Sequence, residues 1–360
     1  MPTRAVQETM KKLLNKIRRK KTEEPSSRIT AETIAEHRER VLAGGRRFKY
    51  PVQVARHRLV ITAISIAVTA ILLFIGLVVW QLYGAQASGT FFYRVTSVVP
   101  LPVASVDGQS VLYSDYLMKY RSSVHYLQDK EQVNLKSEEG QQQAIHVKSE
   151  AMQDAVADAY AQKLAKKNDI TVTSDELQLF LKQQRLSSNG EISVATYNAV
   201  ILDYYGWSPQ EYEHATYNKL LRQKVSYAID TKATETAEAA GVAVSGGQTD
   251  LQALAKTLND QNSIVTYASS GLVPKNNEDG GLAIAAATLQ VGGISSVIKP
   301  TNGDGYYILK LLEANDTQLN YEYVHIALTA FDVQLATLAT DKKINYYITL
   351  PEDPTTTAKK

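Results

Sequence analysis

The longest apolar run in the chain extends from Leu59 to Trp80 and has polar and charged positions on both sides. It holds 22 consecutive residues without a charge. In helical form these residues extend about 33 Å, slightly more than the hydrocarbon core of a bilayer, which is about 30 Å thick. The pattern therefore predicts a single transmembrane helix over residues 59–83.

Apolar positions further along the chain recur at helical spacing. Ile145, Met152, Val156 and Tyr160 form one stripe with intervals of seven, four and four residues. Such a stripe is buried only when it packs against other helices. We therefore expect a helical domain over residues 103–230, preceded by a linker over residues 84–102.

Two helix starts within this predicted domain are marked by capping signals. Thr173 stands three residues before Glu176, and Ser208 is followed by Pro209 and Glu211. A Ser or Thr with Glu three residues later is typical of a capping box, and Pro is favoured at the first helical position. The pattern predicts helices that begin directly after Thr173 and Ser208.

The pattern changes at about residue 231 to shorter elements. Two turn signals, Asn302-Gly303 and Asp304-Gly305, separate the β-rich runs 294–299 and 306–311 and predict a hairpin. Together with two short helices, this predicts a small antiparallel sheet over residues 231–315. Residues 316–350 add a strand, a helix and a last β-rich run, and the tail 351–360 is predicted to be disordered. The expected fold class is α+β.

Charge orients the predicted transmembrane helix. Residues 1–58 contain 16 Lys and Arg against 6 Glu, and the rest of the chain contains 23 basic against 31 acidic residues. The positive-inside rule places the basic segment 1–58 in the cytoplasm and the domains outside. The triplet at 85–87, Ala-Gln-Ala, is typical of a signal-peptidase site, but a cleaved signal has an apolar region of about 7–15 residues. The sequence favours an uncleaved single-pass anchor in the cell membrane, with the lipid bilayer as one partner.

Composition excludes several classes of chemistry. The chain has no Cys and six His, and no two His stand at the spacing of a zinc motif. Signatures of nucleophile-elbow hydrolases, P-loop NTPases and dinucleotide enzymes are missing from the sequence. We expect no metal, no cofactor and no nucleic-acid partner. The sequence does not define the oligomeric state.

Two stretches resemble known families. "VASVDGQSVLYSDY", residues 103–116, resembles the start of SurA-type and PrsA-type extracytoplasmic chaperones, and "GGISSVIKPTNGDGYYILKL", residues 292–311, resembles the closing hairpin of parvulin-type (PpiC) peptidyl-prolyl isomerases. The first resemblance implies a helical domain that binds unfolded secreted polypeptides. It also implies that the chain returns after the isomerase-like module, so that 344–350 pairs with 103–111.

The parvulin resemblance assigns roles to individual residues. It puts Leu272 and Leu282 at apolar positions of the proline pocket, Gln261 where the family has Cys or Asp, and Tyr307 where the family has His. Tyr307 would then serve both the substrate pocket and catalysis. Prolyl rotation makes and breaks no bond, so the reaction needs no cofactor.

The family's first strand, which carries a second His, is missing before this module. "EYVHIALTAFD", residues 322–332, follows the module and has His325 in an alternating strand. One hypothesis is that this strand completes the sheet in a permuted order and places His325 beside Tyr307 as a catalytic residue. The sequence favours the simpler interpretation, in which His325 only packs or hydrogen-bonds.

Two functions are compatible with these patterns. The first is a membrane-anchored extracytoplasmic folding factor that binds unfolded polypeptides and has weak or lost peptidyl-prolyl isomerase activity. The alternative is a non-catalytic structural or assembly protein of the cell envelope that binds one fixed partner. A broad apolar groove exposed between the helical domain and the module would favour the first.

Overall fold

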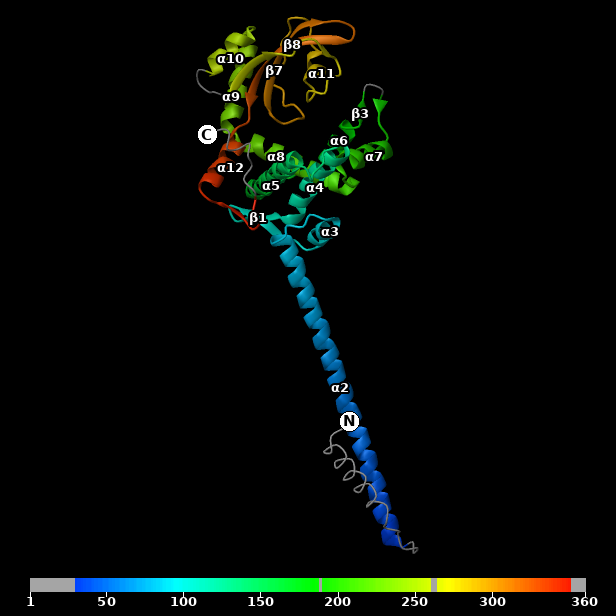
Figure 1. Cartoon of the computed structure of the whole chain (residues 1–360). Coiled ribbons are helices and arrows are strands. Elements are labelled where there is room, and N and C mark those ends of the chain that lie inside the picture. Colours follow the sequence, from blue (N-terminus) through cyan, green and yellow to red (C-terminus); the bar gives the residue numbers. More distant parts are fainter. Residues whose placement is uncertain (1–29, 188–189, 260–263, 351–360) are drawn as a thin grey trace. The chain divides into compact units, whose positions relative to one another are not determined.

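The computed structural model describes residues 30–187, 190–259 and 264–350 (Figure 1). Contact clustering divides the chain into two compact units, Met1–Leu77 and Val78–Lys360. Gln261 and the tail 351–360, for which the sequence makes predictions, lie outside the described residues. The α+β fold class is confirmed.

The first unit is built on the helix α2, Ala31–Tyr83, whose last turns belong to the second unit. Its apolar part, Arg56–Tyr83, has a mean hydropathy of 2.7 and is long enough to cross a membrane. The helix does not stop at the end of the apolar run. Val78 and Leu82 are buried in the core of the second unit, with 7% and 0% exposure, and the Tyr113 hydroxyl donates to the Leu82 carbonyl oxygen at 2.6 Å.

The helical part of the second unit continues through residue 229. Its elements are α3 (Thr90–Val98), β1 (Pro102–Val106), β2 (Gln109–Leu112), α4 (Tyr113–Asp129), α5 (Glu138–Lys167), α6 (Ser174–Gln183), β3 (Leu186–Ser187), β4 (Gly190–Glu191), α7 (Val194–Tyr205) and α8 (Pro209–Ile229). Both predicted capping boxes are confirmed, at Thr173 before α6 and at Ser208 before α8. Three residues of the α5 stripe, Met152, Val156 and Tyr160, are buried as expected, with Met152 fully inaccessible, whereas Ile145 is only partly buried.

The segment predicted as a linker, residues 84–102, contains the helix α3. Phe92 and Val95 of α3 pack against the core of the helical part, and Thr96 is buried. The structure therefore differs from the expectation, because the aromatic and apolar residues of this segment have a helical face that α4 covers.

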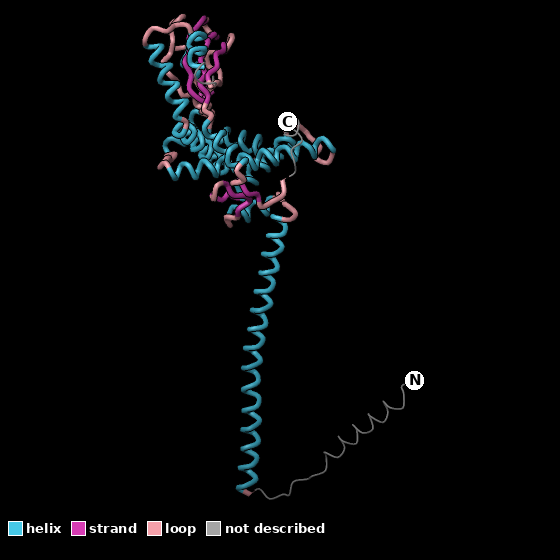
Figure 2. Tube along the Cα trace, turned by 90° about the vertical axis from the view of Figure 1, so that its left-hand side faces the viewer, coloured by secondary structure: helices cyan, strands magenta, loops and turns pink. Residues whose placement is uncertain are grey.

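The isomerase-like module follows directly. Its elements are α9 (Thr231–Ser245), α10 (Leu251–Asn259), β5 (Val265–Ser269), β6 (Val273–Pro274), α11 (Leu282–Ala286), β7 (Gly305–Ala314) and β8 (Gln318–Ala327). The other three strands all pair antiparallel with β8. β7 and β5 lie on its two sides, and β6 pairs with Gln318 and Leu319 at the start of β8. Figure 2 shows these strands gathered apart from the long helices of the helical part.

The two faces of this sheet are covered by different helices. Tyr306, Ile308, Val324 and Ile326 share a core with α9 and α10. The next residues along each strand, including Tyr307 and Tyr321, point to the opposite face and share a core with α11. The predicted hairpin strand 294–299 approaches β7 through two isolated bridges, Ile294 to Lys310 and Ile298 to Tyr307.

After the module the chain returns to the helical part. The helix α12 (Ala330–Thr340) packs its Phe331 ring 5.5 Å from the Tyr160 ring of α5. The strand β9 (Ile344–Tyr346) then pairs antiparallel with β1, with Ile344 opposite Val106. The sequence predicts pairing between 344–350 and 103–111, and the structure has this pairing between 344–346 and 104–106.

Candidate functional site

Tyr307 and His325 lie side by side on neighbouring strands. The register of β7 and β8 places the two residues directly opposite each other, and their ring centroids are 4.4 Å apart with an interplanar angle of 20°. The hypothesis that the later strand completes the sheet and brings His325 beside Tyr307 is confirmed. Their part in catalysis remains a prediction.

Both side chains are held by Asp304, at the turn before β7. The Tyr307 hydroxyl donates to Asp304 Oδ2 at 2.8 Å, and His325 Nε2 lies 3.2 Å from the Asp304 carbonyl oxygen. Burial and the Asp304 carboxylate raise the pKa of Tyr307 above its usual value, so the phenol is protonated at neutral pH. Its proton points to Asp304, and the hydroxyl would have to leave this partner to donate to a substrate amide.

The glycine at position 305 permits this arrangement. A Cβ at Gly305 would lie 2.2 Å from the Ile326 carbonyl oxygen and 2.8 Å from His325 Nε2. The Gly305 carbonyl oxygen accepts a hydrogen bond of 2.6 Å from the hydroxyl of Tyr227, which belongs to α8. The helical part of the unit therefore helps to position the turn on which Tyr307 and His325 depend.

The apolar positions of the predicted proline pocket differ in their burial. Leu282 is buried in the same core as Tyr307, whereas Leu272 is 57% exposed. Leu282 thus belongs to the core that contains α11, Leu272 is exposed to solvent, and the slot lined by both stays a prediction. Neighbouring Tyr323, whose ring centroid is 5.6 Å from that of Tyr307, was not identified from the sequence.

A second candidate site is the exposed apolar surface of α6, the β3–β4 hairpin and α7, here called the apolar arm. These elements follow one another in the chain and carry large apolar side chains that are between 36% and 58% exposed: Leu179, Leu186, Ile192, Val194, Val200 and Leu202. This surface was not predicted from the sequence. The signal was α7 itself, whose sequence VATYNAVILDYY is apolar around most of the helix rather than along one stripe.

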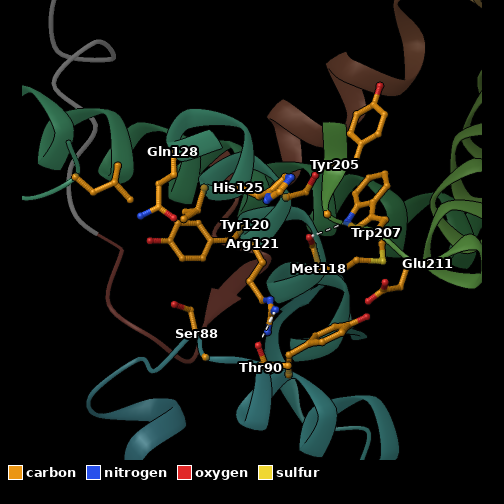
Figure 3. A pocket seen from close by; sticks show the side chains of 16 residues that line it. Ser88, Thr90, Met118, Tyr120, Arg121, His125, Gln128, Tyr205, Trp207 and Glu211 are labelled. Atoms are coloured by element: carbon orange, nitrogen blue, oxygen red, sulfur yellow. Dashed lines mark hydrogen bonds between the residues drawn. The ribbon is translucent and has the colours of Figure 1, made fainter. Parts of the chain in front are cut away.

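A pocket of about 440 Å³ lies between the start of α3, the helix α4 and the connection from α7 to α8 (Figure 3). Arg121 Nη2 donates to Thr90 Oγ1 at 3.0 Å, and the guanidinium lies 5.1 Å from the centroid of the Tyr93 ring. On the other side, the stacked rings of Tyr205 and Trp207 have centroids 5.0 Å apart. Tyr205 ends α7, so the pocket adjoins the apolar arm. The two together offer aromatic, apolar and hydrogen-bonding contacts, as an extended polypeptide requires.

One protein-family model is similar to the helical part. Residues 53–226 match the family described as SurA-like N-terminal domain. Domains of this kind bind unfolded polypeptides, which supports a chaperone-like, extracytoplasmic folding factor. The match ends at residue 226, before the module, so the parvulin-type domain stays a prediction. A comparison with curated proteins found no match.

Proposed function

We propose that this chain is a membrane-anchored extracytoplasmic folding factor whose helical domain holds unfolded secreted polypeptides. The observation that carries the proposal is the apolar arm, because large apolar side chains exposed on three consecutive elements are typical of a site of interaction. It lies within the part of the chain that matches a SurA-like domain. The pocket lined by Arg121, Tyr205 and Trp207, here called the aromatic pocket, adjoins the apolar arm and would contribute polar contacts to the same polypeptide.

The buried end of α2 supports retention of the anchor. Cleavage at 85–87 would remove Val78 and Leu82 from the core of the domain. Residues near that site are themselves hydrogen-bonded to the helix, since Ala87 N donates to the Gln81 carbonyl oxygen at 2.9 Å. The charge difference between the two sides of the span supports a cytoplasmic N-terminus and extracytoplasmic domains.

We further propose that the module has weak or lost isomerase activity. A catalyst of prolyl rotation needs an apolar slot and polar groups that favour the twisted amide. The hydroxyl of Tyr307 already donates its hydrogen bond to Asp304, and the Leu282 side chain is buried in the core. Neither group is free to contact a proline substrate. The surface around Tyr307 and His325 would then act mainly as a binding platform.

Replacing Val194 and Leu202 together by serine is expected to weaken the binding of an unfolded client roughly thirtyfold, because each side chain contributes about 1 kcal/mol when a client covers it. Both residues are more than half exposed, so the stability of the fold should change little. The measurement is suppression of aggregation of a chemically denatured model protein as a function of chain concentration. Val333→Ser, at an equally exposed position on α12, is the matched control. Equal suppression by the double variant and the control would reject the apolar arm as the client-binding surface.

Replacing Tyr307 by histidine is expected to raise prolyl isomerase activity above that of the original chain. An imidazole at this position would restore the pair of histidines that the family carries, and it would lack the phenolic hydroxyl that bonds Asp304. A protease-coupled assay on a proline peptide measures the rate. The gain should disappear when His325→Ala is added to Tyr307→His. A high activity of the original chain that survives Tyr307→Phe would contradict the proposed loss of catalysis.

A further inference from the structure

The helix α3 has two different faces. The inner face packs Phe92 and Val95 against the core of the helical part. The outer face carries Phe91, Arg94 and Val98, at intervals of three and four residues. Phe91 is 53% exposed, Val98 is 83% exposed and Arg94 is also exposed. Large apolar side chains and one cation thus share the solvent-facing side of a helix whose other side is already packed against the core.

The chain keeps α3 close to the end of α2. Six residues separate the end of α2 at Tyr83 from the start of α3 at Thr90, and they fold back rather than extend. Gly84 N donates to the Trp80 carbonyl oxygen at 2.8 Å, and this bond continues the helix by one residue. Trp80, in the last turn of α2, is itself 63% exposed. Trp at this position of an apolar helix is typical of the interface between hydrocarbon and water.

We propose that α3 is an interfacial helix that docks on the lipid surface of the outer leaflet. Phe91 and Val98 would enter the boundary between headgroups and acyl chains, and Arg94 would bind lipid phosphate. This inference rests on the proposed membrane anchor. Lipid is the occupant that the observations favour, because only six residues connect α3 to the end of the apolar helix and because the outer face of α3 combines apolar groups with a cation.

The consequence is a domain that meets the membrane at two points, the span and α3. The start of α3 also lines the aromatic pocket through Thr90 and Tyr93. Docking of α3 would therefore hold one wall of that pocket at the membrane surface, where secreted chains emerge.

The chain contains no cysteine, so single cysteines report on single positions. Val98→Cys, Leu73→Cys and Leu272→Cys are each labelled with the fluorophore NBD in the full chain, which is reconstituted in phosphatidylcholine vesicles with and without doxyl-labelled lipids. Leu73 lies in the span, and Leu272 is an exposed apolar residue of the module; their exposures are 69% and 57%. We expect the label at 98 to emit at shorter wavelength than the label at 272 and to be quenched by shallow doxyl groups. The label at 73 should be quenched by deeper ones.

The three positions separate the two proposals. Quenching at 73 with none at 98 would overturn the docking of α3 and leave the anchor intact. A lack of quenching at 73 would overturn the anchor, and with it the basis for docking. Phe91→Cys repeats the test from the other end of the same face, and circular dichroism confirms that each labelled chain is folded.

Discussion

Replacing Leu82 by alanine is expected to lower the free energy of unfolding of the second unit by about 2–5 kcal/mol. The Leu82 side chain is fully buried in the core of the helical part, beside the ring of Tyr113. Alanine would leave a cavity there that the surrounding helices can close only in part. Urea unfolding of the full chain in detergent, followed by tryptophan fluorescence, measures the change.

Leu77→Ala is the matched control for this experiment. Leu77 is the last residue of the first unit and is 54% exposed, so its truncation should change the unfolding of the second unit by less than about 0.5 kcal/mol. Equal effects of the two substitutions would mean that the end of α2 does not belong to the folded core. The structural argument against cleavage at 85–87 would then fail.

Local signals predicted the helices well. The starts at Thr173 and Ser208 are encoded by side chains that bond backbone groups three residues away, so the sequence alone contains the whole interaction. The helices α3 and α7 were not predicted. Neither carries a capping box, and α7 lacks an apolar stripe because much of its apolar surface stays exposed instead of facing a core.

The site depends on longer-range contacts. The approach of His325 to Tyr307 could be proposed from the sequence because both residues stand in alternating strands and resemble positions of a known family. The role of Asp304 and the exposure of Leu272 could not be predicted, since both follow from how the turn and β6 meet β8. Periodicity indicates which face of a strand is buried, but it does not indicate which helix covers that face.

The connection between the helical part and the module depends on another residue that the sequence did not single out. Asp230 lies between α8 and α9, where the chain enters the module, and it is 2% exposed. Its Oδ1 accepts a hydrogen bond from Ala233 N at 2.9 Å and caps α9. Its Oδ2 accepts from Thr329 N at 2.7 Å and from Ala330 N at 2.9 Å, where the chain leaves the module. One carboxylate therefore connects the segment that enters the module with the segment that leaves it.

Replacing Asp230 by alanine is expected to destabilise the second unit by at least about 4 kcal/mol, because a hydrogen bond to a charged group contributes about 1.5–3 kcal/mol and three backbone donors would lose their acceptor. Asp230→Asn keeps the shape and one acceptor oxygen, so its loss should be smaller. Urea unfolding measures the stability, and hydrogen exchange at the Thr329 and Ala330 amides reports the connection directly. Both amides should exchange faster in the alanine variant even at temperatures where the fold persists. Unchanged exchange of the two amides in the alanine variant would show that the surrounding packing holds the two connecting segments together. The carboxylate would then serve only as the cap of α9.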